Sequence, residues 1–186
     1  MQGRPNREQL LLIRDAVQGR HVHDLGAGDG KLSNLVRELG AAGVTAIDKE
    51  WQTPPGLLSG VSYVREYFVD CHDPIDVALV SWPEQYADMG LSELVRRANV
   101  VIYLGKNTDG TVCGGGGLWC ELIQREILSY EPDPKNTLIV YGPARVGREL
   151  RGEEFAACNL ERIHRYAEVE KGDSTCKQGV GETQGI

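Results

Sequence analysis

The sequence predicts an α/β fold built around a mostly parallel sheet. Apolar segments of strand length alternate along the chain with segments whose apolar residues recur at helical spacing. The segment 77–80 is continuously apolar, as expected for a strand that is covered on both faces. A glycine-rich turn directly follows the first predicted strand, which is where parallel α/β sheets bind ligands.

The predicted elements follow one another in a regular order. A helix is expected at 6–17, where apolar residues share one face, and a second at 31–39, which Gly40 ends. The segment 52–60 contains two prolines and is too broken for a long helix. Further helices are expected at 84–98 and 118–128, and strands at 20–24, 44–47, 61–69, 75–80, 100–104, 137–141 and 160–169.

The composition is that of one soluble domain with a real core. The chain has 186 residues, of which 41% are apolar and 25% are charged. We expect residues 1–170 to form the domain and the polar, glycine-containing segment 171–186 to be a disordered tail. No apolar run is long enough for a membrane span, and the N-terminus lacks an apolar signal segment, so an intracellular, cytoplasmic protein is expected.

Charge and cysteine usage restrict the expected partners. The net charge of −7 argues mildly against broad nucleic-acid binding, although a local basic patch is not excluded. The five cysteines are expected as free thiols, and none forms the C-x-x-C pair that indicates zinc. His21 and His23 should share one face of a strand, but no third ligand with suitable spacing accompanies them, so no metal site is predicted.

The most specific motif is the glycine-rich turn after the first predicted strand. Asp24 precedes Gly26, Gly28 and Gly30, which stand at alternate positions. Glycine lets a ligand approach the backbone closely, and the helix that follows presents unpaired N–H groups. The dinucleotide fingerprint G-x-G-x-x-G would place its third glycine where this chain has Lys31. A nucleotide-like ligand is therefore expected here, with a spacing that disfavours a dinucleotide.

A second acidic residue follows at the distance that suits a ribose. Asp48 ends the predicted strand 44–47 and lies about 20 residues beyond the glycine turn. A carboxylate only accepts hydrogen bonds, so it suits the paired hydroxyls of a ribose. Enzymes that use dinucleotides carry the same acid, so Asp48 does not decide which nucleotide is bound.

The D-x-G-x-G-x-G pattern resembles motif I of the class I S-adenosylmethionine-dependent methyltransferases. The resemblance extends in element order over residues 6–169, with motif I and Asp48 as its specific parts. It implies a Rossmann-like three-layer sandwich whose mostly parallel, seven-stranded sheet has a C-terminal antiparallel strand. It also implies the donor S-adenosyl-L-methionine, with Asp24 near the methionine end and both Trp51 and Asp70 near the adenine. The donor site implied in this way comprises Asp24, Gly26, Ala27, Gly28, Gly30, Asp48, Lys49, Trp51, Asp70 and Cys71.

Residues after the fourth strand are candidates for the acceptor side. Enzymes of this family that methylate amines carry [Asp/Asn/Ser]-Pro-Pro-[aromatic] here, and Ser81 and Pro83 match this pattern whereas Trp82 does not. Ser81 can donate or accept a hydrogen bond, and Trp82 or Tyr86 can stack on an acceptor. The four glycines 114–117 are read as a mobile loop beside them, either a lid or a plain connector.

These expectations describe a methyltransferase whose acceptor is unknown. The acceptor is expected to be a small molecule or an exposed group on a macromolecule. One alternative is a protein that keeps the fold as a catalytically inactive interaction or regulatory module. A second alternative is an NAD-dependent oxidoreductase, which Lys31 in place of the third glycine disfavours.

Overall fold

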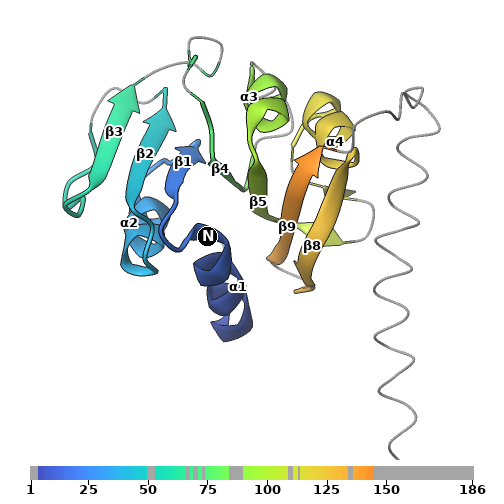
Figure 1. Cartoon of the computed structure of the whole chain (residues 1–186), viewed down its shortest axis with the longest axis horizontal. Coiled ribbons are helices and arrows are strands. Elements are labelled where there is room, and N and C mark those ends of the chain that lie inside the picture. Colours follow the sequence, from blue (N-terminus) through green and yellow to red (C-terminus); the bar gives the residue numbers. More distant parts are fainter. Residues whose placement is uncertain are drawn as a thin grey trace, which may run out of the picture. The chain divides into compact units, whose positions relative to one another are not determined.

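The computed structural model describes residues 4–49, 53–65, 68, 71–72, 74–83, 90–108, 111–112, 114–133 and 136–144. A seven-stranded sheet has the strand order β3-β2-β1-β4-β5-β9-β8 (Figure 1). Two further short strands, β6 and β7, form a separate hairpin. The strands are β1 (His21–Leu25), β2 (Gly43–Asp48), β3 (Val61–Arg65), β4 (Val77–Ser81), β5 (Val100–Gly105), β6 (Asn107–Thr108), β7 (Thr111–Val112), β8 (Arg125–Glu131) and β9 (Thr137–Ala144).

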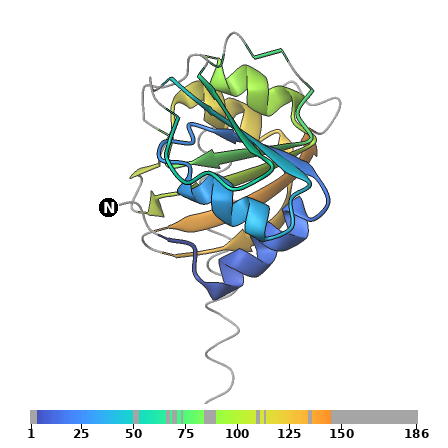
Figure 2. The same cartoon turned by 90° about the vertical axis from the view of Figure 1, so that its left-hand side faces the viewer.

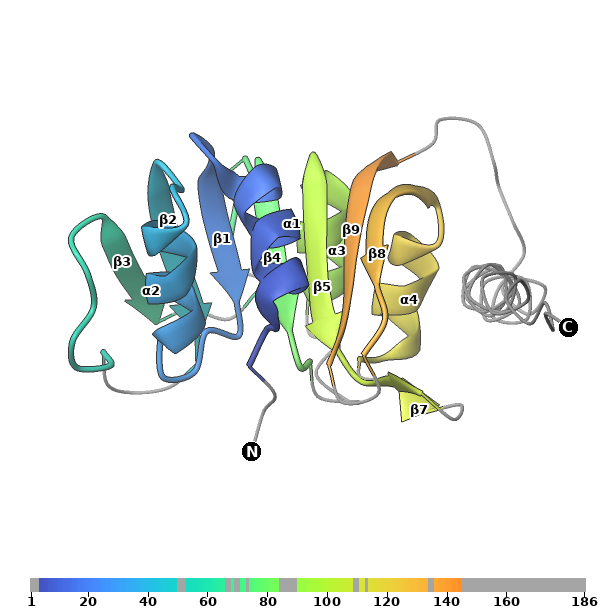
Figure 3. The ribbon, with the colours of Figure 1, turned by 90° about the horizontal axis from the view of Figure 1, so that it is seen from below.

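The sheet is parallel except at one side. Strands β3, β2, β1, β4 and β5 pair in parallel, and β9 enters antiparallel between β5 and β8. The carboxyl ends of the five parallel strands therefore lie at one edge, and β9 begins at that same edge (Figure 3). This arrangement confirms the predicted Rossmann-like sheet with its antiparallel strand near the C-terminal end.

Helices cover both faces of the sheet, which makes three layers. The helices α1 (Arg7–Val17) and α2 (Lys31–Glu38) lie on one face, and α3 (Leu91–Arg97) and α4 (Gly116–Leu122) lie on the other (Figures 1 and 2). None of the helices in the described part of the chain is long and apolar enough to cross a membrane. Of the predicted helix 84–98, the structure shows Leu91–Arg97, which begins after the N-cap Gly90 with φ +88°, and 84–89 lie outside the described residues.

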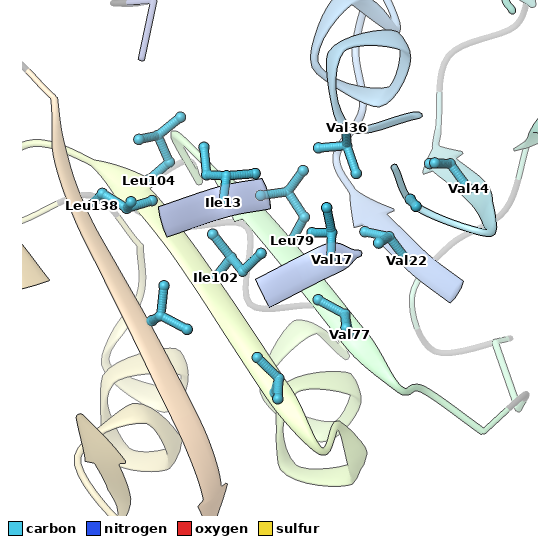
Figure 4. Packing of buried hydrophobic residues seen from close by; sticks show 13 residues of the cluster. Ile13, Val17, Val22, Val36, Val44, Val77, Leu79, Ile102, Leu104 and Leu138 are labelled. Atoms are coloured by element: carbon cyan, nitrogen blue, oxygen red, sulfur yellow. The ribbon is translucent and has the colours of Figure 1, made fainter. Parts of the chain in front are cut away.

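The core lies between α1, α2 and the central strands. Ile13 and Val17 of α1 pack over the sheet beside Leu79 of β4 and Ile102 of β5 (Figure 4). All four side chains are fully buried, which removes apolar surface from water and contributes about 1.5–3 kcal/mol for each. The other buried members of the cluster are Val22, Val36, Ala41, Val44, Val77, Val100, Leu104, Leu138 and Val140.

The predicted C-terminal end of the helix 118–128 was wrong. The helix stops at Leu122, and the predicted helical segment 123–128 instead turns into β8, which begins at Arg125 and pairs with β9. Sheet pairing therefore outweighs the local helical spacing of the leucines and isoleucine. β8 supplies the seventh strand of the sheet, whereas the strand expected at 160–169 and the tail 171–186 lie outside the described residues.

The expectation that the four glycines 114–117 form only a loop was also wrong. Gly116 and Gly117 open α4, and Gly115 precedes them in an extended conformation. The unfavourable helix propensity of glycine is offset here because Leu118 and Leu122 of the same short helix are fully buried. Gly114 alone keeps a backbone that favours glycine, with φ +100°.

A buried arginine joins the C-terminal hairpin to the end of α3. Arg125, the first residue of β8, is only 3% exposed. Its guanidinium donates to the carbonyls of Val95 (2.5 Å), Arg96 (3.1 Å) and Ala98 (2.8 Å) at the end of α3. It also donates to the Gly142 carbonyl on β9 (2.8 Å). A cation at this place adds a donor for the carbonyls at the C-terminal end of the helix and complements the helix dipole.

Candidate functional site

The glycine turn lies between β1 and α2 at the carboxyl edge of the sheet. Gly26, Gly28 and Gly30 all have positive φ, at +83°, +53° and +70°. The N–H groups of Gly26 and Ala27 donate to the Ile47 carbonyl on β2, at 2.9 and 3.1 Å. The turn is thus fixed to the neighbouring strand while its backbone takes a path that only glycine follows without strain.

Two of these glycines serve different purposes. A Cβ at Gly30 would stand 2.6 Å from Leu57 Cδ2, so Gly30 allows the segment 53–60 to pack on the start of α2. A Cβ at Gly28 would meet no atom of the described residues within 4 Å, and Gly28 is exposed. Lys31, where a dinucleotide fingerprint has glycine, is exposed and pairs with Asp29 at 2.5 Å. The space above Gly28 is therefore the open face of the turn.

Both predicted acids lie next to this turn. Asp48, half-buried at the end of β2, accepts the Gly28 N–H through Oδ2 at 2.7 Å. Asp24, on β1, is fully buried. The register pairs Asp24 with Ala46 on β2, two residues before Asp48, so both carboxylates lie close to the same turn.

Asp24 carries the most perturbed carboxyl group of this edge. Ser33 Oγ of α2 donates to Asp24 Oδ2 at 2.6 Å, whereas Oδ1 is buried and has no hydrogen-bond partner among the described residues. Burial disfavours the charged form and raises the pKa of Asp24 to about 6, although the Ser33 bond acts in the opposite direction. The negative charge of Asp48 raises this pKa further. A cation bound nearby would supply the charge partner that Asp24 lacks.

The other residues predicted for the donor site have fewer contacts that connect them to the glycine turn. Ala27 is buried in the turn and Lys49 is exposed after β2, whereas Trp51 and Asp70 lie outside the described residues. Cys71 is buried, and its carbonyl accepts a hydrogen bond from Arg97 of α3 at 3.0 Å. This bond connects Cys71 to α3 rather than to the glycine turn, and its assignment to the donor site stays a prediction.

Phe68 is a residue of this edge that the sequence analysis missed. Its ring reaches to 4.0 Å from the place where a Gly26 Cβ would stand, so Phe68 lies beside the glycine turn. Phe68 is half-buried, and the Cys71 N–H donates to its carbonyl at 3.3 Å. Phe68 falls within the segment 61–69 that was predicted as a strand, so its place in the sequence did not mark it as a residue of this edge.

The acceptor candidates follow β4 at the same edge. Ser81 is the last residue of β4, and Trp82 is the only residue other than glycine with positive φ in the described part of the chain, at +48°. Its N–H donates to the Leu104 carbonyl of β5 at 2.7 Å. Proline fixes φ near −65°, so the backbone at Trp82 differs from that of the amine-methylating motif, which has proline there.

The start of α4 lies against this turn, as expected. A Cβ at Gly114 would stand 3.3 Å from Pro83 Cγ and 2.7 Å from Leu118 Cδ2. The glycine segment and the Ser81-Trp82-Pro83 turn are therefore neighbours. The other predicted aromatic residue, Tyr86, lies outside the described residues.

Two buried amide residues near the acceptor turn were missed by the sequence analysis. Gln9 of α1 and Asn136, which precedes β9, bond to each other, and Asn136 accepts from Trp82 Nε1. One signal was available for Gln9. It stands four residues before Ile13 and eight before Val17, so a polar residue occupies the apolar face of the helix. Nothing in the local sequence marks Asn136.

The two histidines of β1 lie on the same face of the strand, as the sequence predicted. The rings of His21 and His23 pack edge to face with centroids 5.1 Å apart, and His21 Nε2 is 2.8 Å from Thr45 Oγ1. Among the described residues, no group of three or more histidine, cysteine or acidic side chains could hold a metal ion.

Solved structures with a similar fold include several methyltransferases. The ribosomal protein L11 methylase from Lactobacillus delbrueckii subsp. bulgaricus aligns with a TM-score of 0.54 and 16% identity, over 74% of this chain and 79% of that one. An rRNA methylase from Streptococcus thermophilus aligns with a TM-score of 0.53 and 11% identity, over 78% and 99%. A 16S rRNA methyltransferase of T. thermophilus, in complex with AdoMet and guanosine, aligns with a TM-score of 0.51 and 16% identity. The alignment covers 76% of this chain and 44% of that one.

The chain has the fold of class I methyltransferases. At these identities the likeness concerns the fold alone. No family model and no curated protein matches the chain.

Proposed function

We propose that this protein binds S-adenosylmethionine at the glycine turn and transfers its methyl group to an acceptor. One observation carries the proposal. The open face of Gly28 lies beside Asp48, which accepts the Gly28 N–H, at the carboxyl edge of a sheet with the methyltransferase strand order, and the buried Asp24 lies on the strand that leads into the turn. Ligands bind beyond the carboxyl ends of the strands in open α/β sheets.

The donor site residues suit this molecule chemically. Asp48 would accept both ribose hydroxyls, since an ionised carboxylate offers several acceptor positions and no donor. Asp24 has a buried oxygen without a partner in the described part of the chain, and the methionine end of the donor carries an ammonium group that could pair with it. Phe68 would supply an apolar surface beside Gly26. These assignments give the ribose hydroxyls and the ammonium group of the donor a carboxylate partner each.

The reaction would require positioning more than acid–base chemistry. Methyl transfer from a sulfonium is an in-line displacement in which the acceptor atom attacks the methyl carbon and the C–S bond breaks. The leaving group is already good, so a base is needed only where the acceptor must lose a proton. In this chain the residues Ser81, Trp82 and Pro83 would orient the acceptor beside the donor.

Two alternatives make different predictions about ligand binding. An inactive interaction module would keep the fold without methyl transfer, and the departure of Trp82 from the amine-methylating motif favours it. An NAD-dependent oxidoreductase would bind a dinucleotide at the same turn, which Lys31 disfavours. Asp48 is compatible with all three functions.

Thermal unfolding with added ligands separates these functions. S-adenosylmethionine and S-adenosylhomocysteine should each raise the melting temperature at millimolar concentration, and NAD should not, because only a ligand that binds the native state stabilises it. A shift with NAD alone would favour the oxidoreductase. No shift with any of the three would contradict the proposal.

The acceptor can be sought with a radiolabelled donor. Structural neighbours include proteins named for ribosomal RNA and for ribosomal protein L11, so ribosomal RNA, ribosomal proteins and a small-molecule extract are the first three pools to incubate. If RNA is the acceptor, its affinity should fall steeply with salt, because bound cations are released from phosphates. A small neutral acceptor should show almost no salt dependence. Donor binding without incorporation into any pool would favour the interaction module.

A further inference from the structure

A buried chain of amide groups connects the start of α1 to Trp82. Gln9 Nε2 donates to the Asn136 carbonyl at 2.5 Å, and Asn136 Nδ2 donates to Gln9 Oε1 at 3.4 Å. Asn136 Oδ1 accepts the Trp82 Nε1 hydrogen at 3.0 Å. Gln9 is fully buried and Asn136 is 3% exposed. Because 127 residues separate Gln9 from Asn136, only the folded sheet brings this pair together.

The donors at the two ends fix the orientation of both amides. An indole nitrogen can only donate, so Asn136 turns Oδ1 toward Trp82 and Nδ2 toward Gln9. At the other end, the Asn6 N–H donates to Gln9 Oε1 at 3.0 Å, which directs Gln9 Nε2 to the Asn136 carbonyl. At both ends of the amide pair, each donor therefore meets an acceptor. A buried hydrogen-bond network that is satisfied in this way is rigid.

Trp82 holds a conformation that its surroundings must impose. A bulky side chain at φ +48° is strained, and such strain persists only where surrounding contacts fix the residue. The backbone is held by the bond to the Leu104 carbonyl, and the indole is held by Asn136. Trp82 is half-buried, so part of its side chain remains at the surface of the carboxyl edge.

We propose that Gln9 and Asn136 are positioning residues that hold the Trp82 indole in one orientation on the acceptor side of the donor site. This inference rests on the proposed methyl transfer, because it requires the donor to occupy the adjacent glycine turn. The register supports this proximity: Leu25, at the end of β1, pairs with Val80 of β4, two residues before Trp82. An in-line displacement loses rate when the acceptor is misplaced, so a fixed indole would serve the chemistry directly.

The indole N–H signals in a nitrogen-15 NMR spectrum test the proposal. The chain has three tryptophans, and the substitution Trp82→Phe identifies the signal of Trp82. Gln9→Met keeps the side-chain length and removes both bonds to Asn136. In this variant the Trp82 indole N–H should exchange with deuterium at least about tenfold faster, the size expected when a buried bond network is lost. The Trp119 signal should change by less than about twofold, because Trp119 packs on Tyr103 instead.

A second readout links the indole to the donor. S-adenosylmethionine and S-adenosylhomocysteine differ by the transferable methyl group, so a nearby indole should give different chemical shifts in the two wild-type complexes. In Gln9→Met this difference should shrink, because a mobile indole averages its surroundings. The affinity for S-adenosylhomocysteine, measured by calorimetry, should stay within about threefold of wild type, because Gln9 makes no bond to the glycine turn.

Two further variants separate positioning from loss of stability. Asn6→Ala removes the side chain that caps α1 through the Gln9 N–H, but leaves the backbone donor to Gln9 Oε1. It should lower the melting temperature without changing the Trp82 exchange rate. Asn136→Ala removes the indole acceptor and keeps the carbonyl that Gln9 Nε2 contacts, so it should reproduce the effect of Gln9→Met even if that variant does not fold.

Each outcome points to one conclusion. If both ligands bind the wild type but neither variant alters the Trp82 signal, the positioning role is wrong while the donor site stands. Equal acceleration in Asn6→Ala would also reject it, because the effect would then be general destabilisation. If neither ligand binds the wild type, the proposed function fails and this role fails with it.

Discussion

The donor half and the acceptor half of the carboxyl edge are built in different ways. The donor half takes Asp24, the glycine turn and Asp48 from one stretch of chain, which β1, α2 and β2 present together. The acceptor half joins α1, the end of β4, the start of α4 and the start of β9, which are far apart in sequence. A binding site formed by one local stretch suits a ligand that stays the same. A site assembled from distant segments can change in one segment while the others are kept.

Backbone strain is also distributed differently between the two halves. Positive φ in the donor half falls on glycines, which adopt it without a steric penalty. In the acceptor half it falls on Gly114 and also on Trp82, whose backbone donates to β5 and whose indole donates to Asn136 just before β9. We therefore expect the backbone conformation of the donor half to survive changes of neighbouring residues. The conformation of Trp82 in the acceptor half should be lost when its neighbours change.

The largest expected effect tests the open face of the donor half. Gly28→Val should reduce the affinity for S-adenosylhomocysteine by more than about 100-fold, because a branched side chain would fill the space left for the ligand. Calorimetry measures the affinity, and thermal unfolding reports the stability. A folded Gly28→Val variant that binds normally would place the donor elsewhere.

A matched control isolates the strain of this substitution. Gly19 has φ +71°, and a Cβ there also meets no atom within 4 Å, but it lies in the turn before β1 at the opposite edge. Gly19→Val should therefore lose a similar amount of stability, about 1–3 kcal/mol, and keep its donor affinity. Equal losses of affinity in both variants would attribute the effect to strain alone.

The second effect concerns the ribose carboxylate. Asp48→Ala removes charge-assisted acceptors worth about 1.5–3 kcal/mol, so the affinity for S-adenosylhomocysteine should fall by about tenfold or more. Asp29→Ala is the control, since Asp29 is an exposed acid of the same turn whose carboxylate pairs with Lys31. We expect Asp29→Ala to bind within about twofold of wild type in the same calorimetric titration. Unchanged affinity in a folded Asp48→Ala variant would remove the ribose role.

The third effect is a pH dependence that comes from Asp24. The raised pKa, about 6, means that the unliganded protein holds a proton on Asp24 below this pH. Because a cationic donor binds the ionised carboxylate, affinity should rise by up to about tenfold per pH unit until about pH 6 and then level off. In Asp24→Asn the slope should disappear. A wild-type affinity that is flat between pH 5 and pH 7 (both values about one unit from that pKa) would contradict the pairing.

The same carboxyl group predicts the pH dependence of stability without any ligand. Its pKa is higher in the folded chain than the ordinary value of 3.8, so the unfolded chain loses the proton first as the pH rises. Wild-type stability should therefore fall between about pH 4 and pH 6, by roughly 3 kcal/mol in total. The stability gained by Asp24→Asn should grow over that range and stay constant above it, as measured by urea unfolding.

The smallest expected effect on donor binding comes from the acceptor half. Trp82→Ala should change the affinity for S-adenosylhomocysteine by less than about twofold, because the donor is held by the other half. Turnover with the acceptor found by radiolabelling should fall through lost stacking and positioning. If donor affinity is abolished instead, Trp82 belongs to the donor half and the division between the halves is wrong.

The extent to which sequence predicts this molecule follows the same division. The parallel strands and the glycine turn were predictable because each is encoded by adjacent residues, such as the apolar run of β4 and the alternating Gly26, Gly28 and Gly30. The structure of the segment 118–128 was not predictable, because its apolar residues have helical spacing while its second part also has the composition of a strand. Pairing of β8 with β9 decides the outcome, and that contact is absent from a local window.

The acceptor side was only partly predictable for a related reason. Ser81, Trp82 and Pro83 were found by their place after a strand, and the proximity of Gly114 to Pro83 agrees with that expectation. The amide of Asn136 was not found, because its partners Gln9 and Trp82 lie 127 and 54 residues away. The amino-acid sequence around Trp82 does not indicate its positive φ either.

The guanidinium of Arg125 has a consequence for how the chain is made. Helix α3 has only seven residues, which is too short to persist in water by itself. Its last carbonyls are held by Arg125, which follows Val95 by 30 residues. During synthesis, α3 should therefore stay unstable on the ribosome until the C-terminal hairpin has emerged, so that the two segments fold as one late cooperative unit.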